Sequence, residues 1–353
     1  MAKRKKTTKK NGSKSKSKNL IKKSFGFIKN KAVSYLGRRP HRSFRLAKRR
    51  DHVRNLSLPG YIAFTKYVIR TLSKNRKTFL LLALVYAVLT GIVVGMASQD
   101  LYGTLSDTFN NSGGIFAGFV GEITKAGMLF ASAATGGVTN ALSESQQIFA
   151  VVMILLAWLT SVWLLRNIMA GHKVKLRDGL YNSGAPILPT FLIALLGVFQ
   201  LLPVALATIG YSAANTTGLL AGGVEAMLFW FAAGLLTLVS IYFLTSTVFA
   251  LVIITLPGMY PTRAIKTAGD LVVGRRFRIL LRFIWMGLVT MVSWAIIMIP
   301  IIIFDSWLKS VWSGIGWVPI VPVFILVLSS LTVIWVSSYV YLLYRKVIDN
   351  ESV

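Results

Sequence analysis

The sequence PTRAIKTAGDLVVGRRFRILLRFIWMGLVTMVSWAIIMIPIIIF, residues 261–304, joins two patterns that together decide the fold. Its first part has helical spacing, with Arg263 and Lys266 on one face and Ala264 and Ala268 on the other. Four arginines then lead into an uncharged apolar run. A helix of roughly 20 apolar residues crosses the hydrocarbon core of a bilayer. The sequence therefore predicts a short surface helix, a basic elbow and a membrane-spanning helix.

The composition of the chain is that of an integral membrane protein. Of its 353 residues, 54% are hydrophobic and 14% are charged, and the mean hydropathy is +0.63. Soluble domains carry about 25% charged residues, so this chain is too apolar for that class. It contains no cysteine, which excludes disulfides, thiolate metal sites and cysteine nucleophiles.

Apolar runs of spanning length recur along the chain and predict an all-α fold, a polytopic transmembrane bundle of six spans. The spans are expected near 79–97, 147–166, 187–209, 228–255, 281–304 and 322–343. With the helices between them they form a membrane domain over residues 58–347. The flanking parts are predicted to be a disordered Lys-rich tail (1–19), a basic amphipathic surface segment (20–57) and a C-terminal tail (348–353).

The distribution of basic residues predicts the orientation of these spans. The chain carries 40 Lys and Arg against 11 Asp and Glu, and 26 of the basic residues fall within residues 1–77. Cytoplasmic loops of membrane proteins are enriched in Lys and Arg. If both termini are cytoplasmic, only Lys125 and Lys309 lie outside. We therefore predict a multi-pass protein of the bacterial cytoplasmic (inner) membrane with both termini in the cytoplasm.

The segment 114–137 is the main competitor for an additional span. Spanning there would bury Glu122 and Lys125 near the bilayer centre and break the charge asymmetry. We expect an amphipathic helix on the outer surface instead, with a re-entrant segment as the open alternative.

The polybasic N-terminal tail predicts an anionic partner. Ile21, Phe25 and Ile28 recur at helical spacing among lysines. Such basic helices suit the surface of a membrane that contains anionic phospholipids. The same charges can neutralise RNA phosphates on a ribosome, although no RNA-recognition motif is present. A protein partner, such as another membrane protein, is the third alternative.

The order of surface helix, basic elbow and span seen in residues 261–304 occurs at two other places. Residues 61–74 form the surface helix before the first predicted span, and a weaker copy lies within 172–191. The chain thus reads as three units of surface helix, basic elbow and span, each followed by a returning span. The basic side chains of two of these elbows are predicted to bind lipid headgroups. They are Lys66, Arg70, Lys74, Arg76, Lys77, Arg263, Lys266, Arg275, Arg276, Arg278 and Arg282.

The sequence YPTRAIKTAGDLVVGRRFRILLRF, residues 260–283, resembles the elbow of the six-helix membrane domain found in some bacterial glycerophosphoryl diester phosphodiesterases and in related uncharacterised membrane proteins. The residues that carry this resemblance are Ala264, Gly269 or Ala268, Leu271, Gly274, Arg275 and Arg276. The resemblance implies a membrane-domain fold. It implies no activity, because no part of the chain is long and polar enough to form the catalytic barrel of those enzymes.

The sequence offers few groups for chemistry. Its three histidines are His41 and His52 in the basic tail and His172 in a predicted cytoplasmic loop, so no histidine-based metal site or triad is expected. No acidic residue lies deep in a predicted span. We therefore predict no enzymatic activity, no cofactor and no metal.

Two features inside the predicted spans point to helix packing. Ala83, Ala87, Gly91 and Gly95 form a stripe of small residues that permits close approach of helices, within the bundle or in a dimer. Gln200 is a possible internal polar site, and its simpler interpretation is one interhelical hydrogen bond beside the kink at Pro203.

These patterns predict a non-enzymatic membrane scaffold or accessory protein that binds anionic lipids through its tail and elbows. A transporter or permease of unknown substrate is one alternative. A ribosome or nucleic-acid tether at the membrane is another. The oligomeric state is not predicted.

Overall fold

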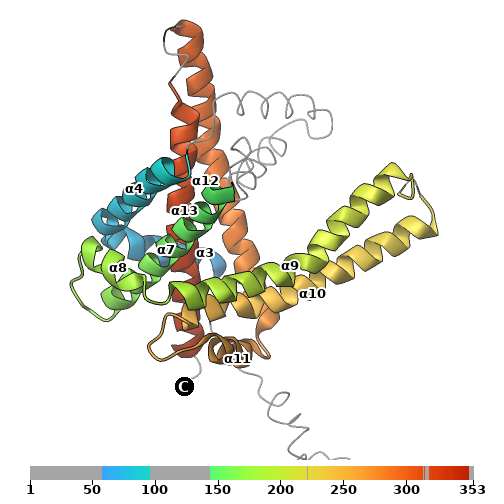
Figure 1. The fold of residues 1–353 in the computed structure, drawn as a ribbon, viewed down its shortest axis with the longest axis horizontal. Coiled ribbons are helices and arrows are strands. Elements are labelled where there is room, and N and C mark those ends of the chain that lie inside the picture. The colour runs from blue at the N-terminus through green and yellow to red at the C-terminus, as the bar shows by residue number, and fades with distance from the viewer. Residues whose placement is uncertain (1–57, 96–143, 221, 313, 315–317, 350–353) are drawn as a thin grey trace, which may run out of the picture. The chain divides into compact units, whose positions relative to one another are not determined.

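The computed structural model describes residues 58–95, 144–220, 222–312, 314 and 318–349, all of which belong to one compact unit, Arg54–Val353 (Figure 1). The predicted basic tail and surface segment, the segment 114–137 and the last four residues lie outside these ranges. Within the described ranges the chain forms helices and no strand.

Nine α-helices make up the described part of the chain. They are α3 (Tyr61–Lys74), α4 (Arg76–Val93), α7 (Glu144–Met169), α8 (Leu176–Ser183), α9 (Ile187–Thr216), α10 (Val224–Ile253), α11 (Pro261–Val272), α12 (Arg276–Val311) and α13 (Ile320–Asp349). Six of them, α4, α7, α9, α10, α12 and α13, are long and apolar enough to cross a membrane. Each coincides with a predicted span. The prediction of an all-α bundle with six spans is confirmed, and the protein is a multi-pass membrane protein.

The helices follow one another in three modules, each consisting of one short helix and two spans. The modules are α3–α4–α7, α8–α9–α10 and α11–α12–α13. Local sequence explains the elbows: Pro261 occupies the first position of α11, where its missing N–H costs nothing. Gly274 then adopts a φ of 78° between α11 and α12, a conformation that favours glycine.

Contacts between the modules link the first module to the last. Within each module the two spans pack on each other, as α9 and α10 do in Figure 1. Each short helix also packs on the last span of the module before it: α8 contacts α7, and α11 contacts α10. The short helix of the first module, α3, contacts α13, the last span of the third. The order of contacts is therefore cyclic.

The short helices bury equivalent residues. Two positions one turn apart face the core in each: Phe64 and Val68 in α3, Gly179 and Ser183 in α8, and Ala264 and Ala268 in α11. Residues four apart lie on the same side of a helix, so each pair forms one contact surface. At Gly179 the packing is so close that a Cβ would lie 3.0 Å from the side chain of Leu164.

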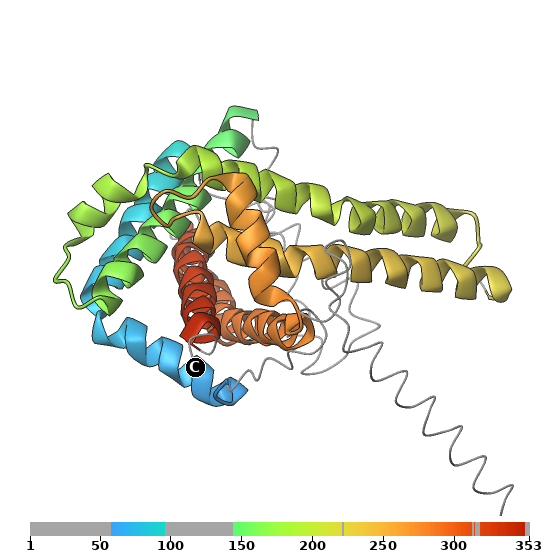
Figure 2. The ribbon, with the colours of Figure 1, turned by 90° about the horizontal axis from the view of Figure 1, so that it is seen from below.

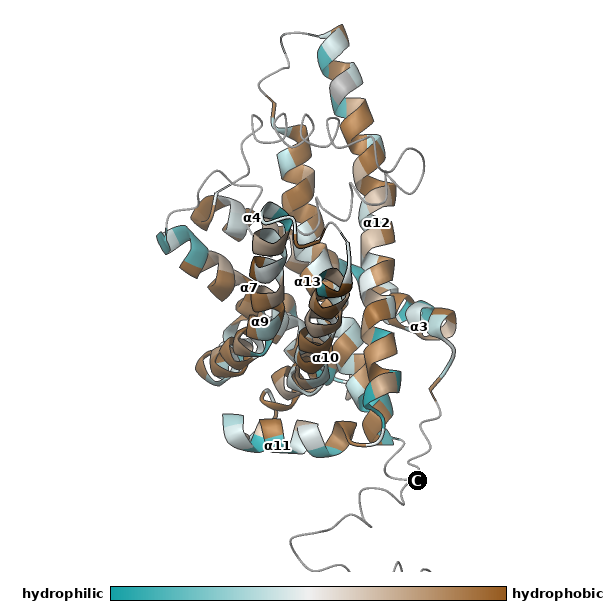
Figure 3. Ribbon diagram, turned by 90° about the vertical axis from the view of Figure 1, so that its right-hand side faces the viewer, coloured by the Kyte–Doolittle hydropathy of each residue, from teal (hydrophilic) through white to brown (hydrophobic). Residues whose placement is uncertain are grey.

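The main apolar core lies where the short helices meet the spans, an end of the bundle that we call the basic end. Its largest continuous contribution comes from α13, where every residue from Ser337 to Tyr344 is buried. The far halves of α9 and α10 differ, because large apolar side chains such as Leu206 and Phe231 are 63% and 72% exposed. Figure 2 shows these two helices side by side, and the hydropathy colouring of Figure 3 is mostly hydrophobic over both. Such surfaces suit contact with lipid.

Candidate functional site

The basic side chains that the sequence singled out fall into two groups at the basic end. Eight are exposed: Lys66, Arg70, Lys74, Arg76, Lys77, Arg263, Lys266 and Arg278. Arg276 is half-buried, whereas Arg275 and Arg282 are buried. The exposed residues come from α3, α11 and the first turns of α4 and α12.

Arg275 and Arg282 are buried, which corrects the expectation that these two side chains are exposed like the other basic residues of the elbows. The guanidinium of Arg275 donates from Nη1 to the Val347 carbonyl, 3.4 Å away in the last turns of α13. Arg282 donates from Nη2 to the carbonyl of Pro59, just before α3. Their burial could not be expected from the sequence, because the residues that cover them, before α3 and at the end of α13, are distant in the chain.

Two other arginines at the basic end also bind backbone carbonyls. Arg166, in the last turn of α7, donates from Nη1 to the Thr255 carbonyl at 2.7 Å, just beyond the end of α10. Carbonyl groups at a helix C-terminus lack hydrogen-bond donors within the helix and carry partial negative charge. A guanidinium supplies both a donor and a positive charge. Arg276 donates from Nη1 to the Tyr242 carbonyl at 3.0 Å and stacks over the ring of that tyrosine. These contacts attach elbows to neighbouring spans.

The contact between the first and third modules is built from aromatic side chains around Arg282. The guanidinium lies 4.2 Å from the ring centroid of Tyr61 and 5.8 Å from that of Phe64, both in α3. The ring of Phe64 meets that of Tyr339 edge to face, with centroids 4.9 Å apart. In the next turn of α12, Trp285 Nε1 donates to Thr65 Oγ1 at 3.0 Å. We call this group the α3 clasp.

A second polar group is buried where the first two modules meet. Thr160 Oγ1 in α7 is 2.9 Å from the Tyr86 hydroxyl in α4 and 2.8 Å from Ser183 Oγ in α8. All three side chains are buried. One threonine thus joins three helices, and all three hydroxyls have a partner. Sequence reasoning missed this group, because single hydroxyls within apolar runs give no pattern.

Gln200 takes part in helix packing. Thr247 Oγ1 in α10 donates to Gln200 Oε1 at 2.7 Å, and the nearby Gly197 is buried against the same threonine. The simpler interpretation of Gln200, one interhelical hydrogen bond near Pro203, is confirmed. The hydroxyls of Ser337 and Ser338 in α13 donate to the carbonyl of Ile334 in their own helix.

The small-residue stripe of α4 is used in part within the bundle. Ala83 and Ala87 are buried, and α4 contacts α13 and α7. Gly91 is half-buried. Gly95 lies beyond the helix with a φ of 96°, so it ends α4 rather than extending the stripe.

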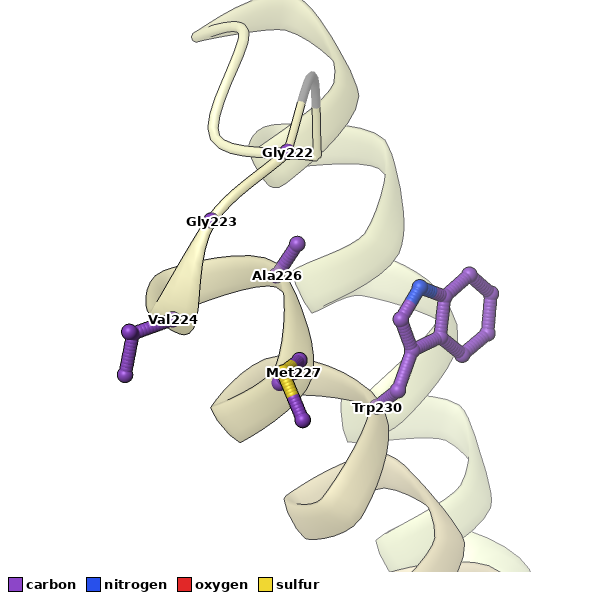
Figure 4. A pocket seen from close by; sticks show the side chains of 6 residues that line it. All are labelled: Gly222, Gly223, Val224, Ala226, Met227 and Trp230. Atoms are coloured by element: carbon purple, nitrogen blue, oxygen red, sulfur yellow. The ribbon is translucent and has the colours of Figure 1, made fainter.

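The far end of the bundle has an open hollow at the turn between α9 and α10 (Figure 4). It is lined by Gly222, Gly223, Val224, Ala226, Met227 and Trp230. The ring of Trp230 lies 5.9 Å from that of Tyr211 in α9. The lining offers no ionisable side chain, so the hollow has no group for acid–base chemistry.

Among the described residues no group of three or more histidines and acids is placed to hold a metal ion. No protein family, curated protein or solved structure is detectably similar to the chain. The resemblance of the elbow to the phosphodiesterase membrane domain therefore remains an expectation.

The three-helix hydroxyl group generates a stability prediction. Thr160→Val keeps the shape of the side chain but leaves Tyr86 and Ser183 without their shared partner. An unsatisfied buried hydroxyl costs about 1–3 kcal/mol. We expect a clear drop in the melting temperature of the purified protein in detergent, followed by tryptophan fluorescence.

The matched control is Thr190→Val. Thr190 is equally buried but bonds only to the Pro186 carbonyl of its own helix. Its loss is expected to change the melting temperature less. Equal shifts for the two variants would show that the contact between α4, α7 and α8 contributes no more than a local bond.

Proposed function

We propose that the protein is a non-enzymatic scaffold or accessory protein of the bacterial cytoplasmic membrane that binds anionic phospholipids at its basic end. One observation carries this proposal: exposed Lys and Arg side chains lie on α3, on α11 and in the first turns of α4 and α12, the elements that share the main apolar core. Near an anionic surface each such side chain contributes about 1 kcal/mol to binding.

The α3 helix combines three surfaces that suit the boundary between lipid and water. Phe64 and Val68 face the protein core. On one flank Ile62 and Ile69 are 62% and 49% exposed, which leaves an apolar stripe for the acyl chains. The exposed basic residues Lys66, Arg70 and Lys74 follow beside that stripe. A helix with this arrangement lies in the interfacial plane.

The α11 helix uses its apolar face differently. Ala264, Ala268 and Val272 are buried against the protein, and Arg263 and Lys266 are exposed. Figure 3 shows polar and apolar residues interspersed along this helix. We propose that α11 presents charge to the headgroups without inserting into the lipid.

The proposed orientation places the basic end and both termini in the cytoplasm. It is supported by the excess of Lys and Arg at that end and by the general enrichment of these residues in cytoplasmic loops. The inner leaflet also carries the anionic lipids that attract basic segments.

Neutralising the basic surface of α3 tests the lipid proposal. The triple variant Lys66→Gln, Arg70→Gln and Lys74→Gln removes three exposed charges and is expected to weaken the preference for phosphatidylglycerol over phosphatidylcholine several-fold. The preference is measured with spin-labelled lipids and protein reconstituted in vesicles, at low and high salt.

The matched control, Lys66→Arg, Arg70→Lys and Lys74→Arg, keeps the charge and is expected to keep the preference. A variant lacking residues 2–56 separates the contribution of the N-terminal tail. An unchanged preference in both the neutral triple variant and the tail deletion would refute the lipid proposal. If the protein instead sediments with ribosomes in a salt-sensitive way, and this requires residues 2–56, the result would favour a ribosome or nucleic-acid tether at the membrane.

The orientation is tested by cysteine labelling, which is simple because the chain has no cysteine of its own. Asn215→Cys at the end of α9 and Thr267→Cys in α11 both replace exposed residues. With a membrane-impermeant maleimide on intact cells, we expect Asn215→Cys to react and Thr267→Cys to react only after permeabilisation. The reverse pattern would invert the proposed orientation.

A further inference from the structure

Arg282 occupies a position where the other two modules have an aliphatic residue. It is the seventh residue of α12, and Leu82 and Ile193 are the seventh residues of α4 and α9, the corresponding spans of the other modules. Leu82 and Ile193 are fully buried, and Arg282 is only 6% exposed. In the other two modules an uncharged side chain fills this position, so packing alone does not explain the presence of an arginine in the third module.

In the part of the chain that the structure describes, the guanidinium of Arg282 is buried without an anion. Its Nη2 donates to the Pro59 carbonyl, but Nη1 is buried and has no hydrogen-bond partner of ordinary geometry among the described residues. In the described ranges no carboxylate forms an ion pair with it. The faces of Tyr61 and Phe64 offset part of the lost hydration. A buried cation nevertheless remains unfavourable until a negative group binds it.

Two other sources of hydrogen-bond donors lie at the same place. The hydroxyl of Tyr339 is buried beside the Arg282 guanidinium and makes no hydrogen bond of ordinary geometry. The N-terminus of α3 begins at Tyr61, whose ring covers the guanidinium. No side chain caps this helix end and its first turn has no acid, so its first N–H groups and positive dipole end are not neutralised by a side chain.

We propose that Arg282, Tyr339 and the N-terminus of α3 form a binding site for one phosphate group, that of an anionic phospholipid. A phosphate oxygen accepts from Nη1 of Arg282, a second interaction comes from the Tyr339 hydroxyl, and the α3 N–H groups and helix dipole complete the site. Helix N-termini and arginine are the usual partners of phosphate in proteins. This proposal rests on the proposed lipid binding and adds a single specific site to it.

The surroundings of the site explain how a lipid phosphate reaches it. Arg282 lies about 9 Å along α12 from its first residue, given the 1.5 Å rise per residue, so it is near the basic end of this long helix. Tyr61 is 39% exposed and follows Gly60, where a Cβ would meet no other atom within 4 Å. The partly exposed Tyr61 ring is therefore the group that a phosphate has to displace to reach the guanidinium. The exposed Ile62 next to it offers a surface for an acyl chain.

Native mass spectrometry of the full-length protein tests the site. The protein is delipidated in detergent and titrated with phosphatidylglycerol, and the occupancy of the first bound lipid is measured. We expect Arg282→Gln to lower the affinity for that lipid about tenfold or more, because it removes a charged hydrogen bond. Tyr339→Phe is expected to lower it about threefold, in keeping with loss of a neutral hydrogen bond. Arg177→Gln, which neutralises an exposed arginine of α8 outside the proposed lipid-binding surface, is the matched control and is expected to keep it.

Loss of the first lipid in Arg282→Gln and Tyr339→Phe but not in Arg177→Gln supports the site. Competition by inorganic phosphate at millimolar concentration supports the phosphate chemistry, and tight binding of phosphate without lipid would identify free phosphate as the ligand instead. Equal lipid affinity in the wild type and in both site variants would overturn the proposal.

The test is separable from that of the general lipid preference. The neutral triple variant of α3 is expected to lose the preference of the whole surface and keep the first lipid, because its three substituted residues lie outside the site. Arg282→Gln is expected to do the opposite. Since Arg282→Gln removes a buried side chain, Tyr339→Phe, which only deletes a hydroxyl, keeps the test valid if the first variant does not fold.

Discussion

The contact between α3 and the last two spans is the constraint on which the rest of the structure depends. Each of the other short helices packs on the span that directly precedes it in the chain, α8 on α7 and α11 on α10. Chain connectivity alone brings those pairs together. The α3 helix follows no described span, so its partners α12 and α13 come from the other end of the sequence. Arg282, Trp285 and Tyr339 provide that contact.

Polar and aromatic contacts join the modules at the basic end. The ion pair between Lys309 and Asp305 lies at the far end of α12, away from these contacts. At the basic end arginines bind carbonyls, and Thr160 links three helices. Such contacts are expected between helices in a membrane. Lipid tails are as apolar as the helix surfaces, so helices associate through close packing and interhelical hydrogen bonds and not through the hydrophobic effect. The basic end can thus present a strong positive charge and still be well packed.

The sequence predicted the parts of the fold that depend on local patterns. Span lengths follow from the thickness of the bilayer, and α11 follows from helical spacing, Pro261 and Gly274. The burial of Arg282 could not be predicted, because it depends on residues 59–64 meeting residue 339. From sequence alone, Arg278 and Arg282 look equivalent, yet one is exposed and the other is covered by Tyr61. Likewise, nothing in the apolar run around Thr160 shows that its hydroxyl has two partners in other helices.

The central claim, that the first module meets the third at the α3 clasp, is tested most directly by a cysteine pair. Phe64→Cys and Tyr339→Cys replace side chains whose rings touch in the structure, in a chain without other cysteines. A protease site placed between residues 96 and 143 then separates α3 from α13 after cleavage. We predict that a short bis-maleimide keeps the two fragments together in membranes, and that Ile62→Cys, on the exposed flank of α3, does not pair with Tyr339→Cys. Separation of the Phe64–Tyr339 fragments, or equal linking from Ile62, would contradict the cyclic order of contacts.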